Sequence, residues 1–233
     1  MRQKVWFITG ISRGLGRSIA QAVLNRGDIV IGTSRDGTSR AKGESNKFHV
    51  LPLEVTNRDQ VFSTIAEAQR LQGQIDVVVN NAGCGLIGAI EETSVQEFQH
   101  VLDVNFLGAV HVTQAVLPYL RKQRSGHIVN ISSLAGFSAP PSSGFYAAAK
   151  YALEGMSLSL RKEVAPLGIQ VTLVEPGGLR TDFFDESSLP RLRCSQAGAV
   201  PRRTDRATVQ SVGEPVEQYQ LPGLAILICY TRR

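Results

Sequence analysis

The stretch VWFITGISRGLG, residues 5–16, decides the fold class of this chain. It begins with a continuous apolar run that contains β-branched side chains, which is typical of a strand buried on both faces. Glycines follow directly, and apolar residues then recur at helical spacing over residues 14–26. A strand that passes through a glycine loop into a helix predicts the beginning of a parallel β-α-β arrangement.

The glycines of this loop have the spacing G-x-x-x-G-x-G. Gly10 permits the tight turn, Gly14 lets the backbone approach a pyrophosphate, and Gly16 lets the helix pack closely on the sheet. The N–H groups and the positive end of the helix dipole then face the phosphates. As an isolated motif the loop is as often an ordinary turn, so its interpretation depends on the rest of the chain. The loop residues that we assign to a dinucleotide are Gly10, Ile11, Ser12, Arg13, Gly14, Leu15 and Gly16.

Strand-like and helix-like segments alternate beyond the glycine loop. Residues 37–46 are polar and too few for an ordinary crossover helix, so we expect a loop or a single helical turn there. The alternation predicts the α/β class, with a single doubly wound, Rossmann-like parallel sheet and helices on both faces. The predicted strands with their exit loops are residues 28–34, 48–55, 75–83, 127–133 and 169–178, and the further helices are residues 57–72, 94–123 and 144–165.

Unusual residues gather where these predicted strands end. The glycine loop Gly10–Gly16 follows the first strand, Asn80–Gly83 the fourth, Ser132–Ser133 the fifth and Pro176–Gly178 the sixth. Ligands on doubly wound sheets bind outside the carboxyl ends of the strands. The sequence therefore predicts a ligand site at this edge of the sheet.

The C-terminal part of the chain breaks the alternation. Residues 187–233 are rich in Arg, Ser, Gln and Pro, and their periodicity is weak. Only the apolar run Leu224–Tyr230 has the character of a last strand. We expect one domain, in which residues 1–186 hold the predicted ligand site and residues 187–233 form an atypical segment, for which the family resemblance given below implies a truncated substrate lid.

Composition excludes several other classes of protein. With 42% hydrophobic and 19% charged residues the chain is globular, and its +5 charge comes without the alternating aromatic residues of a nucleic-acid interface. The three cysteines lie far apart and form no metal-binding pattern, so we expect no metal and free thiols in a reducing compartment. The N-terminus lacks a signal-peptide pattern, and the late apolar run is shorter than the ~20 residues of a membrane span. We expect a cytoplasmic protein with no membrane span.

A second cluster, Ser133, Tyr146 and Lys150, carries the predicted chemistry. Tyr146 and Lys150 stand four residues apart on a predicted helix, so their side chains share a face. A phenol has an ordinary pKa near 10, and an ammonium held close to it favours the phenolate and lowers that pKa. Tyr146 can then exchange a proton with a substrate oxygen, which the Ser133 hydroxyl could also hold. A Y-x-x-x-K pair by itself is more often a surface pair.

In combination, these motifs resemble the short-chain dehydrogenases/reductases over residues 4 to about 184. TGISRGLG looks like the family's TGxxxGxG, NNAG at residues 80–83 resembles its NNAG motif, and PGGLRTD at residues 176–182 resembles the loop that holds the nicotinamide carboxamide. The resemblance implies that Asn105 supports a water-linked proton relay through Lys150, which also binds the nicotinamide ribose. The implied catalytic residues are Asn105, Ser133, Tyr146 and Lys150, and the implied cofactor contacts beyond the glycine loop are Ser34, Arg35, Glu54, Val55, Asn81, Ala82, Gly83, Tyr146, Lys150, Pro176, Gly177, Leu179 and Thr181.

The resemblance implies an NADP(H)-dependent oxidoreductase that interconverts a carbonyl and a secondary alcohol. Within that family, the sequence is most similar in general character to the hydroxysteroid-dehydrogenase-like reductases. Such proteins form homodimers or homotetramers. Ser34 leaves no acid to repel a 2′-phosphate, and Arg35 and Arg13 can approach one. Glu54 departs mildly from the family, which usually has Asp at this place. The alternatives are a dinucleotide-binding regulatory or catalytically weak protein and, less favoured, a nucleic-acid binder that uses the Arg-rich tail.

Overall fold

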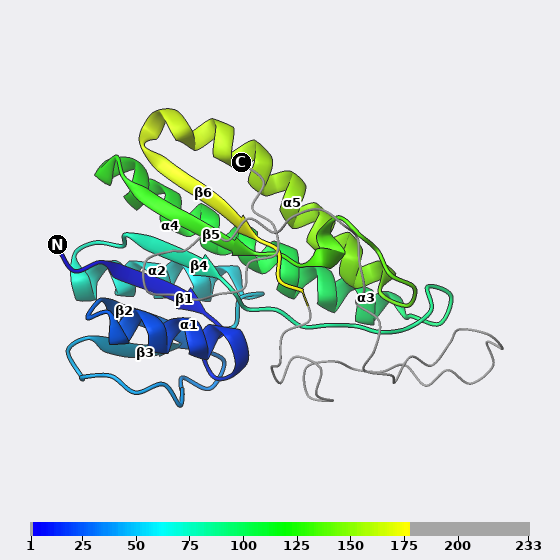
Figure 1. The fold of residues 1–233 in the computed structure, drawn as a ribbon, viewed down its shortest axis with the longest axis horizontal. Coiled ribbons are helices and arrows are strands. Elements are labelled where there is room, and N and C mark those ends of the chain that lie inside the picture. The colour runs from blue at the N-terminus through cyan, green and yellow to red at the C-terminus, as the bar shows by residue number, and fades with distance from the viewer. Residues whose placement is uncertain (1, 178–233) are drawn as a thin grey trace.

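Six parallel strands form a single sheet in the computed structural model, which describes residues 2–177 (Figure 1). The order of the strands is β3-β2-β1-β4-β5-β6. This order confirms the predicted doubly wound sheet, because the chain builds outward from β1 in one direction and then returns to build outward from β4 in the other. The strands are β1 Val5–Thr9, β2 Ile29–Ser34, β3 Phe48–Pro52, β4 Val77–Asn80, β5 Gly126–Ile131 and β6 Ile169–Val174.

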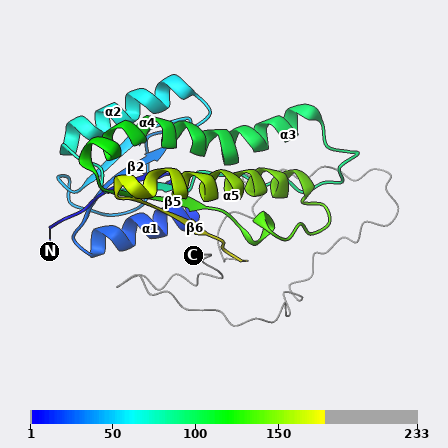
Figure 2. The same ribbon diagram turned by 90° about the horizontal axis from the view of Figure 1, so that it is seen from above.

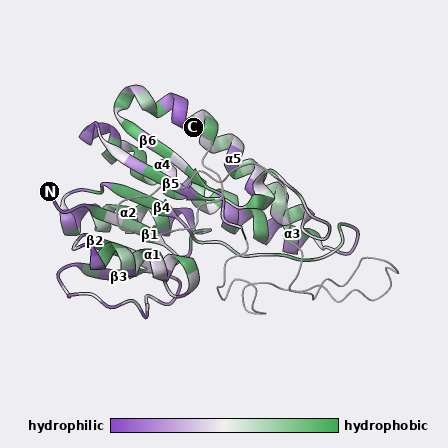
Figure 3. Cartoon of the chain, in the orientation of Figure 1, coloured by the Kyte–Doolittle hydropathy of each residue, from purple (hydrophilic) through white to green (hydrophobic). Residues whose placement is uncertain are grey.

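Helices cover both faces of the sheet, as the alternation predicts. Apolar side chains of α2, α4 and α5 form one core with the sheet, whereas those of α1 form a second core on the opposite face (Figure 2). Figure 3 shows hydrophobic colouring along the strands and more hydrophilic colouring on the outer turns of the helices. The helices are α1 Gly14–Asn25, α2 Arg58–Gln72, α3 Val95–Leu102, α4 Gly108–Gln123 and α5 Gly144–Val164.

The helix predicted at residues 94–123 is not one regular α-helix. A π-helical turn, Asp103–Leu107, separates α3 from α4, and the N–H of Gly108 bonds to the carbonyl of Asp103 five residues back. The side-chain amide of Asn105 donates to the Val101 carbonyl at 2.9 Å, which gives that carbonyl a partner across the widened turn. By length and composition alone, Val95–Gln123 is the one stretch of the described chain that could cross a membrane, and 44% of its apolar window is buried inside the protein.

The segment between β2 and β3 contains no helix, which confirms the loop predicted at residues 37–46. All strands end at the same edge of the sheet because they are parallel. The order reverses between β1 and β4, and this is the place where open α/β sheets bind their ligands. The loops that follow β1 and β4 are the glycine loop and the Asn81–Gly83 segment.

Candidate active site

The glycine loop has the backbone that only glycine adopts easily. Gly10 and Gly14 have φ angles of +73° and +54°, in the left-handed region. A Cβ at position 16 would overlap the carbonyl oxygen of Gly10 and the side-chain amide of Asn81. The loop therefore lies directly against the segment that follows β4, at the switch point of the sheet.

Asn81 and Thr9 brace this loop. The amide of Asn81 donates to the carbonyl oxygens of Thr9 at 2.8 Å and Gly10 at 3.0 Å. In return, the Thr9 hydroxyl accepts the backbone N–H groups of Asn81 and Ala82, both at 3.0 Å. The Asn81 side chain thus holds the shape of the cradle, while its predicted contact with the cofactor stays a prediction.

The N-terminus of α1 fits a phosphate. No side chain caps it, and its first turn carries no acid. The first N–H groups of a helix have no partner within the helix, and together with the helix dipole they favour an anion. Ile11 is fully buried in the core beside α1, so only its backbone can face a ligand. The cradle therefore fits the pyrophosphate of a dinucleotide.

Gly16→Ala should destabilise the protein by about 1–3 kcal/mol and weaken dinucleotide binding, because the added methyl group has no space between Gly10 and Asn81. Gly155→Ala on α5 is the matched control, because nothing lies within 4 Å of the added Cβ there and alanine favours a helix. Thermal unfolding and titration with NADPH measure both effects. Equal binding by the two variants would contradict the role of the cradle.

At the end of β2, the arrangement of Ser34 differs from the open 2′-phosphate site that the sequence predicts. The Ser34 hydroxyl is turned into a tight loop, where it is 2.9 Å from a carboxylate oxygen of Asp36 and accepts the N–H of Thr38 at 2.8 Å. The hydroxyls of Thr38 and Ser34 donate to the Asp36 carboxylate and hold its pKa below the ordinary value, with the larger effect from Thr38. Arg35 is exposed. Sequence reasoning missed Asp36, although it stands two residues after Ser34.

Ser133, Tyr146 and Lys150 lie together at the carboxyl end of β5. Ser133 follows β5, and its hydroxyl is hydrogen-bonded with the Tyr146 phenol on α5. The ammonium of Lys150 lies 5.7 Å from the centre of the Tyr146 ring and donates to the carbonyl of Ile131 at 2.9 Å. Lys150 is only 5% exposed. The fold therefore brings these three predicted residues into one group.

Burial is the largest influence on the pKa values of Tyr146 and Lys150. It raises the pKa of Tyr146 to about 12, against the smaller opposing effect of the hydrogen bond with Ser133. It also lowers the pKa of Lys150 to about 8, although the nearby Cys84 and Glu154 favour the charged form. The lowered phenol pKa expected from the Tyr146–Lys150 spacing is therefore not found, because desolvation of the phenol dominates and the nearby Cys84 adds to the rise.

Asn105 contacts Cys84, which lies beside Lys150 of the catalytic group. Its amide nitrogen donates to the Cys84 carbonyl at 2.8 Å and lies 3.7 Å from the Cys84 sulfur. Burial raises the pKa of that thiol, whereas the charge of Lys150 lowers it. The buried Oδ1 of Asn105 has no hydrogen-bond partner within the described part of the chain. Sequence reasoning missed Cys84 as a neighbour of the site, and its position directly after Gly83 is the signal that could have found it.

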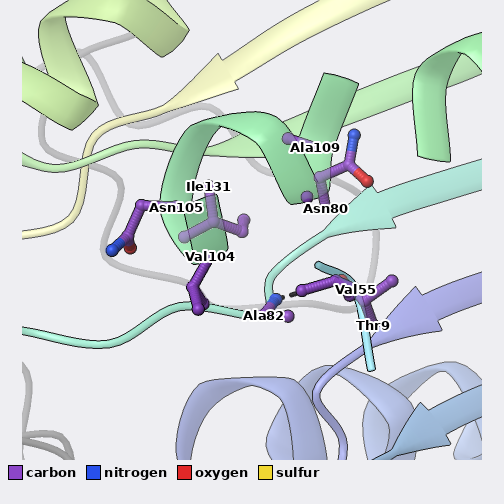
Figure 4. A pocket seen from close by; sticks show the side chains of 9 residues that line it. Thr9, Val55, Asn80, Ala82, Val104, Asn105, Ala109 and Ile131 are labelled. Carbon is purple, nitrogen blue, oxygen red and sulfur yellow. Dashed lines mark hydrogen bonds between the residues drawn. The ribbon is translucent and has the colours of Figure 1, made fainter. Parts of the chain in front are cut away.

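A small cavity lies between the glycine-loop strand and the π-helical turn (Figure 4). Its volume is about 10 Å³, close to what a single water molecule needs. The buried Oδ1 atom of Asn80, which belongs to a lining residue, lacks a partner among the described residues. The lining residues are Thr9, Val55, Asn80, Ala82, Val104, Asn105, Gly108, Ala109 and Ile131.

The other predicted contacts lie around this edge. The Glu54 carboxylate accepts the N–H of Thr56 at 3.2 Å. After β6, the carbonyl of Pro176 accepts the N–H of Leu134 at 3.2 Å, and Gly177 faces the Leu134 side chain, so this loop meets the turn that follows Ser133. Leu179 and Thr181 lie outside the described residues, as does the segment 187–233.

A doubly wound sheet with a phosphate cradle at its switch point defines a dinucleotide-binding protein of the Rossmann type. The chain belongs to the short chain dehydrogenase family, which it matches over residues 4–191. It is therefore a member of a family of oxidoreductases that bind nicotinamide dinucleotides.

Curated relatives share this core. The chain is 45% identical over 188 residues to oxidoreductase BOA17 of Botryotinia fuckeliana, covering 79% of this chain and 69% of the relative. It is 41% identical over 192 residues to the 3-ketodihydrosphingosine reductase of Bacteroides thetaiotaomicron, covering 82% of this chain and 70% of that reductase.

Solved structures share the fold. A short-chain dehydrogenase from Streptomyces avermitilis superposes with a TM-score of 0.76 at 38% identity, over 82% of this chain and 71% of that one. ElxO with NADP bound has a TM-score of 0.74 at 31% identity, over 79% and 78% of the two chains. A Burkholderia phymatum short chain dehydrogenase/reductase in complex with NAD has a TM-score of 0.73 at 29% identity, over 78% and 68%.

Proposed function

We propose that the protein is an NADP(H)-dependent oxidoreductase that interconverts a carbonyl and a secondary alcohol, with Tyr146 as its acid/base. The observation that carries the proposal is the contact between Ser133 and Tyr146 above the buried Lys150, at the sheet edge that holds the glycine cradle. When bound, the nicotinamide supplies or accepts the hydride.

The side chains of the site have the following roles in this proposal. The Ser133 hydroxyl and the Tyr146 phenol hold the substrate oxygen, and the phenol gives or takes its proton. Lys150 holds positive charge beneath the phenol and binds the nicotinamide ribose. Asn105 supports the proton path to Lys150 through a water molecule. Glu54 and Val55, the Asn81–Gly83 segment and the Pro176–Thr181 loop border the cofactor.

The substrate that we propose is a ketone with an apolar body. Tyr146 belongs to a small apolar cluster at the site, whose members are Cys84, Leu86, Val101, Leu102, Phe145, Tyr146 and Ala149. The relative from Bacteroides thetaiotaomicron bears the name of a reductase of a lipid ketone, and the hydroxysteroid-dehydrogenase-like look agrees with an apolar substrate.

A screen of ketones and secondary alcohols with NADPH and NADP⁺, followed by absorbance at the nicotinamide band, tests the function. We expect turnover with apolar ketones and NADPH. Tight NADPH binding without turnover of any substrate would favour the alternative, a dinucleotide-binding regulatory protein with weak catalysis.

We predict that NADP(H) is preferred over NAD(H). Exposed Arg35 follows Ser34 directly, and Arg13 lies in the glycine loop, so two guanidiniums can reach a 2′-phosphate. Arg35→Ala should lower kcat/KM for NADPH by about 10- to 10²-fold and leave that for NADH nearly unchanged, since a charged hydrogen bond contributes about 1.5–3 kcal/mol. Arg26→Ala, at the far end of α1, is the control for the loss of one positive charge. Equal kcat/KM values for both cofactors, unchanged by Arg35→Ala, would refute the preference.

We predict that the protein forms a homodimer, or a homotetramer, through the helical stretch at residues 94–123 and through α5. Ala148 and Tyr151 are exposed on α5, one turn apart, and offer a small and apolar surface to a second copy. Light scattering should find a dimer or tetramer at micromolar concentration, and Ala148→Arg should shift it to the monomer because a guanidinium would be buried against its own copy. A monomer in the parent protein would contradict the prediction.

The remaining proposals concern the whole chain. We propose that residues 1–186 and 187–233 belong to one domain, that the protein acts in the cytoplasm on a small molecule, and that it binds no nucleic acid. Cys84, a free thiol beside Lys150, supports a reducing compartment. The absence of binding to DNA or RNA at low salt tests the last point.

A further inference from the structure

Buried side chains form a continuous chain of hydrogen bonds from β4 through β5 to α5. The Asn80 amide donates to Oδ1 of Asn130 at 2.7 Å, and the Asn130 amide donates to Oγ of Ser157 at 2.7 Å. Ser157 in turn donates to the Leu153 carbonyl at 2.6 Å. Asn80, Asn130 and Ser157 are 5%, 0% and 1% exposed. Buried polar groups are costly unless they are paired, and their directional bonds fix one arrangement of the elements that carry them.

A second polar contact joins the same helix to the same strand. Lys150 donates to the carbonyl of Ile131, the residue that follows Asn130 in β5. Lys150 and Ser157 are seven residues apart on α5 and therefore share a face. The helix is thus fastened to β5 at two points, two turns apart. Between them on the helix lies Leu153, which is 1% exposed, and the burial of an apolar side chain has no directional preference.

We propose that the Asn130–Ser157 hydrogen bond positions the catalytic helix: it sets the rotation and the axial position of α5 on β5, and through them the place of the Lys150 ammonium beneath Tyr146. Ser157 and Asn130 are positioning residues that touch neither substrate nor cofactor. This inference rests on the proposed function for its effect on turnover, but its effect on Lys150 does not depend on a substrate.

Lys150 reports on this position. Cys84 faces its ammonium from the loop after β4, Glu154 lies one turn further along α5, and Tyr146 lies one turn before it. Burial is the largest influence on its pKa, which stands at about 8. Any rotation or slide of α5 that brings the ammonium closer to water therefore moves this pKa toward the ordinary value of 10.5.

The test compares Ser157→Ala with Thr113→Val in the full chain. Thr113 is 4% exposed and lies 3.4 Å from the same Asn80 amide, but it sits on α4. In protein labelled with ¹³C-lysine, the Cε resonance that disappears in Lys150→Met is followed against pH without any ligand. Ser157→Ala should raise its midpoint by about half a pH unit or more, Thr113→Val should leave it at the parent's value, and Ser157→Thr should restore it.

An unchanged Lys150 midpoint in folded Ser157→Ala, or an equal shift in Thr113→Val, would overturn the proposal. If Ser157→Ala does not fold, Ser157→Cys replaces it, because the thiol keeps a weaker hydrogen bond and a similar shape. Turnover is the second readout: kcat should fall about tenfold to 10²-fold, since small misplacements of catalytic groups have effects of this size. A shifted midpoint in a protein whose parent turns over no substrate would leave the positioning role standing and refute the proposed function.

Discussion

Tyr146→Phe is expected to lower kcat by about 10²–10⁴-fold while the dissociation constant for NADPH changes little. The substitution keeps the ring within its apolar cluster and removes only the hydroxyl that is bonded with Ser133. In the proposed mechanism this hydroxyl is the group placed to transfer the proton. Stopped-flow or steady-state reduction of an apolar ketone measures kcat, and nucleotide fluorescence measures binding.

Tyr151→Phe is the matched control for this prediction. Tyr151 lies on the same helix but is 47% exposed, so the loss of its hydroxyl should leave kcat within about twofold of the parent value. Near-normal turnover in Tyr146→Phe would remove the catalytic assignment, and the dinucleotide-binding regulatory alternative would then become the leading one.

The local sequence pattern was sufficient to predict the strands and helices that carry the site. The apolar run at residues 5–9 forms β1 within the predicted bounds, and the helix predicted at residues 144–165 is α5, Gly144–Val164. These segments are strongly periodic or continuously apolar, so their neighbours in space do not change the outcome. The Tyr146–Lys150 spacing likewise predicted the shared face correctly, because helix geometry alone determines it.

Features that depend on distant contacts could not be predicted in this way. The π-helical turn contains Asn105, whose amide reaches the Cys84 carbonyl 21 residues earlier in the chain. The raised pKa of Tyr146 depends first on its burial and, to a smaller extent, on the nearby Cys84. Neither contact can be recognised from the spacing of residues in the sequence. The direction of the Tyr146 pKa shift could therefore be determined only from the folded structure.

Lys150→Met should abolish most turnover and, at the same time, stabilise the folded protein. Lys150 is assigned both the charge beneath Tyr146 and a cofactor contact, so we expect kcat/KM to fall by at least about 10²-fold. The pKa of Lys150 falls from 10.5 to about 8 on folding, which means that burial of its charge opposes folding at neutral pH. Since one pKa unit corresponds to about 1.4 kcal/mol, removing the charge should raise the free energy of unfolding at pH 7 by roughly 1–3 kcal/mol.

The free energy of unfolding depends on pH through Lys150, and the direction of this dependence follows from its pKa shift. The folded Lys150 has the lower pKa, so above pH 8 the unfolded chain binds more protons and the free energy of unfolding rises with pH up to about 10.5. Tyr146 acts in the opposite sense, because its folded pKa of about 12 exceeds the ordinary value of 10.0 and its contribution is lost only at higher pH. Between pH 8 and 10, urea unfolding of the parent should therefore show a rise that is absent in Lys150→Met. Parallel curves for the two proteins would mean that the Lys150 charge is not buried at a cost, and a stabilised variant with full turnover would remove Lys150 from the mechanism.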